Sequence, residues 1–113
     1  MKIENAKISS VMLGIEDHGI LTAFVHLVGD GWGCGFGGYV LGMEDRHNPN
    51  CGLFIRRVLE TLEVNEWEKL KGTIVRAESD GPGGGIYRIG HAYKDKWFDP
   101  KKEFEAYRQE ENK

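Results

Sequence analysis

The stretch Ile20-Leu21-Thr22-Ala23-Phe24-Val25-His26-Leu27 decides the fold class. It is rich in β-branched and aromatic residues, and its two faces differ in polarity, which predicts a β-strand. The more apolar face, which we expect to point inward, consists of Leu21, Ala23, Val25 and Leu27. Turn-forming residues bound the strand at Glu16–Gly19 and at Val28–Gly31. The stretch is therefore expected to be the middle one of three successive strands.

Its neighbours on both sides also have β-like patterns. Ile3–Ser10, continued by Val11–Leu13 and ended by Gly14, predicts the first strand, and the extended run Trp32–Met43 predicts the third. Later in the chain, Thr73–Ala77 and Ile86–Tyr93 predict two more strands. The loop between them, Ser79–Gly85, is rich in glycine.

Two segments have helical spacing instead. Apolar residues recur every three or four positions from Leu53 to Leu62, which predicts an amphipathic helix of about three turns with Asn50 as its N-cap. Asn65–Leu70 predicts one further helical turn, ended by Gly72. Asp99 is a predicted N-cap and Pro100 the first residue of a last helix.

The order β-β-β-α-β-β-α predicts an α+β domain with a mostly antiparallel sheet of about five strands and two helices. The 113 residues are enough for a single domain, 1–113. Fifteen Lys and Arg against eighteen Asp and Glu give a net charge of −3, which argues against DNA or RNA as a partner.

Membrane insertion and export are also not expected. The longest nearly apolar run, Ile20–Gly29, is too short to span a bilayer, and the N-terminal residues lack a signal-peptide pattern, so we expect a cytoplasmic protein. Cys34 and Cys51 have no metal-ligand or disulfide spacing and are expected to be thiols. No metal or cofactor is predicted.

The most unusual segment is Gly29–Gly38, which holds six of the sixteen glycines. Glycines at this density favour either close approach of the backbone to a ligand, with N–H groups donating to phosphate or ribose oxygens, or bulges and tight packing within the sheet. Gly33, Gly35 and Gly38 match the nucleotide fingerprint Gly-x-Gly-x-x-Gly. We reject that motif because the residues after it are β-like, whereas the fingerprint opens a helix.

Other polar and aromatic residues allow two interpretations each. The guanidinium group suits phosphate, but each arginine can equally form surface ion pairs; the candidates are Arg56, Arg57, Arg76, Arg88 and Arg108. Trp97–Phe98 can stack a base or pack the last helix on the sheet. His18 follows Asp17 in a turn, where solvation is more common than catalysis, and a structural role is expected for His26 and His91.

Four segments together resemble the Thoeris anti-defence sponge family of small phage proteins: Met12–Leu21, Gly35–Tyr39, Phe54–Leu59 and Ile89–Phe98. The resemblance implies an antiparallel sheet with helices, assembly into homodimers or larger homo-oligomers, and binding of cyclic ADP-ribose isomers without cleavage. Some members also hold cyclic oligonucleotides at a separate site. It implies a ligand-sequestering protein in the host bacterial cytoplasm and no catalytic residue.

For such a ligand, aromatic rings would stack the adenine, while arginines and backbone N–H groups would meet the diphosphate, in pockets between subunits. The predicted ligand-binding residues are Gly35, Phe36, Gly37, Gly38, Tyr39, Arg56, Arg57, Trp97, Phe98 and Arg108.

Two alternative functions stay open. One is an enzyme that degrades such a nucleotide with His18 or His91 as acid or base. The other is a phage protein that binds a host protein through Trp32, Phe36 and Tyr39.

Overall fold

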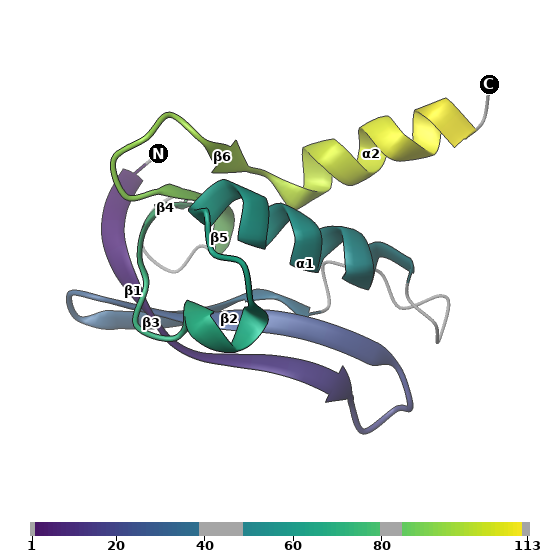
Figure 1. Cartoon of the computed structure of the whole chain (residues 1–113), viewed down its shortest axis with the longest axis horizontal. Helices are drawn as coiled ribbons and strands as arrows, with labels where there is room; N and C mark the ends of the chain where they lie inside the picture. The colour runs from purple at the N-terminus through teal and green to yellow at the C-terminus, as the bar shows by residue number, and fades with distance from the viewer. Residues whose placement is uncertain (1, 39–48, 80–84, 112–113) are drawn as a thin grey trace.

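The computed structural model describes residues 2–38, 49–79 and 85–111. In these ranges a six-stranded antiparallel sheet carries α1 on one face, and α2 extends beside α1 (Figure 1). The strands are β1 (Lys2–Ile15), β2 (Leu21–Gly29), β3 (Trp32–Gly37), β4 (Ile74–Ser79), β5 (Ile86–His91) and β6 (Trp97–Phe98). The helices are α1 (Pro49–Leu62), the short 3-10 helix η2 (Trp67–Leu70) and α2 (Pro100–Glu111). The α+β class is confirmed, with one strand more than expected.

The inward face of β2 is the predicted one. Ala23, Val25 and Leu27 are fully buried, because α1 covers this side of the strand. The predicted turn before β2 also forms: Gly19 has a φ of 79°, and its N–H donates to the Glu16 carbonyl at 2.9 Å. This conformation favours glycine and closes the β1–β2 hairpin.

The sheet curls around its core. Its strand order is β3-β2-β1-β4-β5-β6, so β3 and β6 lie at opposite edges. Nevertheless, the ring centroids of Phe36 on β3 and Phe98 on β6 are only 6.1 Å apart. Phe54 of α1 lies 5.6 Å from Phe36 and 5.7 Å from Phe98, so three aromatic rings form the centre of the core.

The predicted N-cap is confirmed for α2 and is wrong for α1. α2 is capped as predicted: Asp99 Oδ1 accepts a hydrogen bond from the Lys102 N–H at 3.2 Å, and Pro100 begins the helix. α1 begins at Pro49, so Asn50 lies in its first turn and not at the cap. Proline is favoured at the first helical position because its missing N–H has no partner there.

Strand boundaries differ from the predictions in the second half of the sheet. β5 ends at His91 because residues 92–96 form a turn, and β6 is a strand of only two residues that was not predicted. Both cysteines are free thiols, as expected. No helix in the described ranges is long and apolar enough to cross a membrane.

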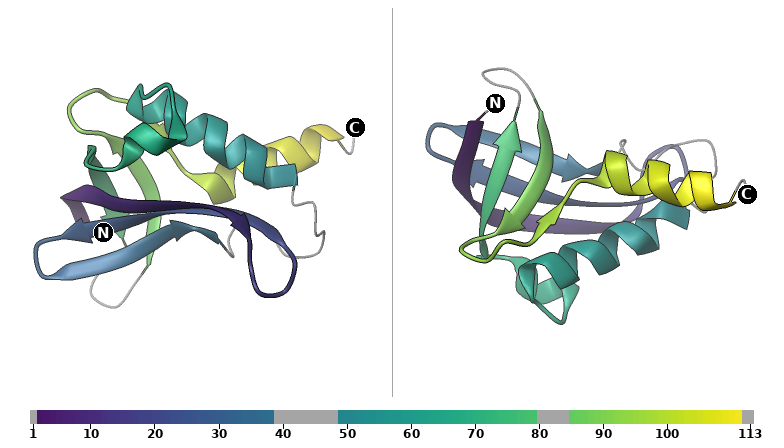
Figure 2. Two further views of the ribbon diagram at one scale, coloured as in Figure 1. Left: turned by 60° about the horizontal axis from the view of Figure 1, so that its bottom comes forward. Right: turned by 90° about the horizontal axis from the view of Figure 1, so that it is seen from above.

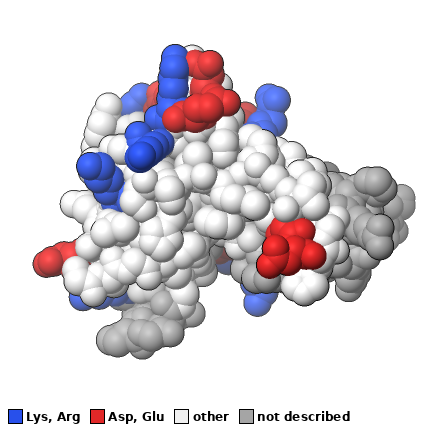
Figure 3. All heavy atoms as spheres, turned by 90° about the horizontal axis from the view of Figure 1, so that it is seen from below, with Lys and Arg blue, Asp and Glu red and all other residues white. Residues whose placement is uncertain are grey.

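Charges are distributed unevenly over the sheet face turned away from α1. Figure 3 shows this side, and among the described side chains its middle carries neither Lys and Arg nor Asp and Glu. Met12 pairs with Phe24 and Ser10 with His26 across β1 and β2. Clustered charges lie elsewhere, around β5, β6 and the start of α2.

Candidate functional site

A pocket of about 380 Å³ lies between the end of the sheet and the first turns of α2. Its lining combines two aromatic side chains, two cations and three carboxylates: Tyr87, Trp97, Arg88, Lys102, Glu78, Asp99 and Glu103. Because β6 pairs only with Ile89 and Gly90, the preceding residues of β5 lie at an open sheet edge beside the pocket.

Trp97 is held over a glycine. It pairs with Gly90 across β5 and β6, and a Cβ atom on Gly90 would lie 2.6 Å from Trp97 Cε3. The guanidinium carbons of Arg76 and Arg88 lie 4.5 Å and 4.1 Å from the centre of the indole. Cation–π contacts of this kind fix the indole in place. A ligand that reaches Trp97 therefore meets it together with an arginine.

Arg88 is itself positioned by a buried carboxylate. Glu78 is only 3% exposed, and its Oε1 accepts a hydrogen bond from Arg88 Nε. Burial raises the pKa of Glu78, but hydrogen bonds from Tyr87 and Arg88 outweigh burial and hold that pKa below its ordinary value. Glu78 is therefore ionised at neutral pH and anchors Arg88 at the pocket wall.

Arg57 joins α1 to β6 and α2. Its Nε donates to Glu103 Oε1 at 2.6 Å and its Nη2 to the Trp97 carbonyl at 3.4 Å. Its guanidinium carbon also lies 5.5 Å from the centre of the Phe98 ring. The hydrogen bond to Glu103 raises the pKa of Arg57. Arg57 thus supports the pocket from behind, with its charge already paired.

The turn that leads into Trp97 is tied to the end of α1. Glu63 directly follows the last residue of this helix and has a φ of 57°. Its Oε2 lies 2.8 Å from Lys94 Nζ and 3.5 Å from His91 Nε2. The hydrogen bond from Lys94 lowers the pKa of Glu63. This ion pair holds the β5–β6 turn against α1 and so sets the position of β6.

The pocket's charges divide into paired and available groups. Each carboxylate already has a partner: Glu78 has Arg88, Glu103 has Arg57, and Asp99 accepts from the backbone of α2. Lys102 is exposed at the rim and is the lining cation best placed to approach a phosphate.

Of the ten predicted ligand-binding residues, Trp97 lines the pocket and Arg57 supports it. Phe36 and Phe98 are 2% and 0% exposed and belong to the core, so neither ring offers a surface on which a base could stack. Their burial follows from the curl of the sheet, which brings the edge strands together over Phe54.

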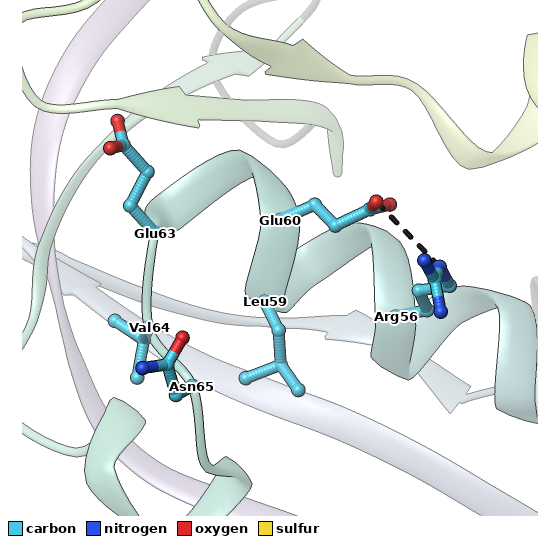
Figure 4. Close-up of a pocket in the computed structure, with 6 residues that line it drawn as sticks. All are labelled: Arg56, Leu59, Glu60, Glu63, Val64 and Asn65. Carbon is cyan, nitrogen blue, oxygen red and sulfur yellow. Dashed lines mark ion pairs between the residues drawn. The ribbon is translucent and has the colours of Figure 1, made fainter.

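Arg56 points away from this pocket. It is exposed on α1, its Nε lies 3.6 Å from Glu60 Oε2, and it lines a separate hollow on the outer side of that helix (Figure 4). Arg108 belongs to α2, but its side chain lies outside the described part of the structure, as does the whole of Tyr39.

The predicted glycines lie on or just after β3, at the other edge of the sheet. Gly37 has a φ of 109° and Gly38 a φ of 68°, and a Cβ atom on Gly37 would lie 2.6 Å from Phe54 Cζ. At Gly37, therefore, the structure directly supports tight packing within the sheet as the reason for the glycine. Gly35 has no such restriction, since a Cβ atom there would meet nothing within 4 Å.

Two of the histidines, His18 and His91, have identifiable side-chain partners. His91 is 9% exposed, and its Nδ1 accepts hydrogen bonds from the N–H groups of Tyr93 and Lys94, which supports a structural role. His18 is exposed, with Nδ1 2.8 Å from Glu16 Oε2. No group of three His, Cys, Asp or Glu residues in the described ranges is arranged to hold a metal ion.

The sequence did not indicate that Glu78, Tyr87 and Lys102 would meet around Trp97. One signal of this site was present in the sequence: the two-residue period of a strand puts Arg88 and Gly90 on one face of β5. The pairing of Gly90 with Trp97, however, depends on the length of the turn between β5 and β6, which the sequence did not determine. Comparisons with protein-family models, with curated proteins and with solved structures found no match. The function is therefore argued from the pocket and from the sequence resemblance.

Proposed function

We propose that this protein binds a cyclic nucleotide signal, a cyclic ADP-ribose isomer, and sequesters it without cleavage, and that it thereby inhibits host anti-phage defence. The observation that carries the proposal is the pocket in which Trp97 lies beside Arg88, with Lys102 at the rim. An aromatic surface next to one anchored cation and one exposed cation suits a ligand that is part heterocycle and part phosphate.

The volume of the pocket and the anchored position of Arg88 also favour ligand binding. About 380 Å³ falls within the range of small-molecule sites, roughly 300–1,000 Å³. Arg88 is held by Glu78 before any ligand arrives, so little side-chain entropy is lost when it makes a contact. A cyclic ADP-ribose isomer would place its base against the indole edge and Arg88, and its diphosphate toward Lys102.

A release experiment tests the proposal. The protein is mixed with a purified cyclic ADP-ribose isomer in slight molar deficit, the free nucleotide is collected by ultrafiltration, and the retained fraction is then heated to denature the protein. Sequestration predicts almost no free nucleotide before heating and recovery of the intact compound afterwards. Nucleotide that stays free throughout contradicts the proposal.

The enzyme alternative has one specific observation in its favour. His18 Nδ1 lies 2.8 Å from a carboxylate oxygen of Glu16, an arrangement that can orient a general base. The same experiment separates the two functions, because an enzyme at substoichiometric concentration converts the nucleotide into a product of different mass. Loss of that conversion in His18→Ala would then assign the base.

A further inference from the structure

Glu63 occupies a backbone position that favours glycine. In the described ranges it is the one residue other than glycine with a positive φ. The N–H of Val64 donates to the Leu59 carbonyl at 3.1 Å, which is the hydrogen bond of a Schellman motif with Glu63 as the first residue after the helix. Glycine is the usual residue there, because a side chain at positive φ is strained. A glutamate is therefore less stable at this position than glycine, unless its side chain has a compensating role.

The Glu63 side chain reaches from the end of α1 to the β5–β6 turn. Figure 4 shows it pointing away from the Arg56–Glu60 pair on the same helix, and both views of Figure 2 place the turn, in yellow-green, beside the end of α1. Its carboxylate oxygens lie 2.9 Å and 2.8 Å from Lys94 Nζ, and Oε2 lies 3.5 Å from Lys96 Nζ. Among the described residues, neither lysine has another carboxylate within 4.0 Å. One carboxylate therefore balances both lysines of the turn.

These cations lie next to Trp97. Lys96 directly precedes it in the chain, and Arg76 lies over its indole while donating to a carbonyl of the turn. Arg76 holds the turn to the sheet but forms no ion pair in the described ranges, and neither does Asp95, the carboxylate of the turn itself. The Glu63 carboxylate is thus the charged group that draws the turn toward α1 and offsets the repulsion between its cations.

We propose that Glu63 is a positioning residue for Trp97: from the strained end of α1, its carboxylate fixes the β5–β6 turn and so sets where the indole stands beside Arg88. Glu63 does not line the Trp97 pocket and acts through the two lysines of the turn. Its effect on nucleotide binding rests on the proposed function, whereas the position of Trp97 is measured without any ligand.

Two substitutions at this position separate the strain from the carboxylate. Glu63→Gly and Glu63→Ala both remove the carboxylate, but only glycine adopts a φ of 57° without strain. We therefore expect a higher urea unfolding midpoint for Glu63→Gly than for Glu63→Ala. Glu66→Ala is the control, because Glu66 has an extended backbone with a φ of −134° and, among the described residues, pairs with Lys69 alone.

Indole N–H signals in a ¹H–¹⁵N correlation spectrum report the surroundings of Trp97. The chain has three tryptophans, so three signals are expected, and Trp97→Phe assigns one of them. The Trp32 indole nitrogen is buried and serves as an internal reference. In Glu63→Gly and Glu63→Ala the Trp97 signal should shift to the same extent while the Trp32 signal stays in place. In Glu66→Ala the Trp97 signal should not move.

Calorimetric titration with a cyclic ADP-ribose isomer adds a second readout. Glu63→Gly is expected to bind this nucleotide more weakly than the wild type by about threefold or more, although it is the more stable of the two Glu63 variants. Glu66→Ala should bind it as the wild type does.

The outcomes separate this inference from the proposed function. A Trp97 signal that stays in place in both Glu63 variants, or that moves only in Glu63→Ala, overturns the positioning role. Equal urea midpoints for the two variants overturn the strain argument, and a moved signal with wild-type affinity overturns the role in binding. A wild-type protein that binds no nucleotide contradicts the proposed function, and the Trp97 signal alone then decides the role of Glu63.

Discussion

Replacing Gly37 by alanine separates chain geometry from ligand contact in the glycine run. The residue has a φ of 109°, where side chains are strained by about 1–3 kcal/mol. Its new Cβ atom would also lie 2.6 Å from Phe54 Cζ and 2.7 Å from the Ala23 carbonyl oxygen. Neither neighbour moves freely, since Phe54 is fully buried and the carbonyl belongs to β2, and overpacking of this kind costs about 1–3 kcal/mol.

The two costs together, less about 0.4–1 kcal/mol regained from a less flexible unfolded chain, amount to roughly 1–5.5 kcal/mol. With a urea dependence of about 2 kcal/mol per molar, the unfolding midpoint should fall by roughly 0.5–2.8 M. Gly35→Ala is the control on the same strand, because its methyl group meets nothing within 4 Å, and its midpoint should move little. Equal midpoints for the two variants would refute the packing argument at Gly37.

Two further stability predictions follow from the contacts around the pocket. Arg57→Met should lower the unfolding free energy by about 1–3 kcal/mol in urea titrations, because it removes charged hydrogen bonds between α1 and Glu103, whereas Arg56→Met should change it by less than about 0.5 kcal/mol. The pKa of Glu78 is lowered in the folded state, so its contribution to stability is present at neutral pH and is lost as the pH falls below the ordinary Glu range. Urea midpoints at pH 7 and pH 3.5 should therefore differ less in Glu78→Gln than in the wild type, and an unchanged difference would contradict this role of the carboxylate.

Patterns confined to one element predicted the structure well. The alternation in β2 identified both the strand and its buried face, and Asp99 followed by Pro100 located the start of α2. Each of these signals acts over a few residues and depends on local geometry, which tertiary contacts here reinforce.

Features that depend on strand register or on the curl of the sheet could not be predicted from the sequence. Phe36 stands among glycines and Phe98 follows a lysine-rich turn, and both resemble exposed aromatic residues until the curl brings them together over Phe54. β6 is too short to show a period, so the sequence could not indicate that Trp97 would lie on Gly90. Of the residues that line the candidate pocket, only Trp97 is among the ligand-binding residues predicted from the sequence.

The central claim is that the Trp97 pocket binds an anionic nucleotide, and neighbouring lysines of α2 provide the most direct test. Lys102 lines the pocket and Lys101 does not, although both are exposed in the first turn of the helix. Calorimetric titration at low salt with a cyclic ADP-ribose isomer should show binding to the wild type, a loss of at least tenfold (about 1.4 kcal/mol) in Lys102→Glu, and a change of less than about threefold in Lys101→Glu. Equal losses in the two variants, or no binding to the wild type, would contradict the assignment of the pocket.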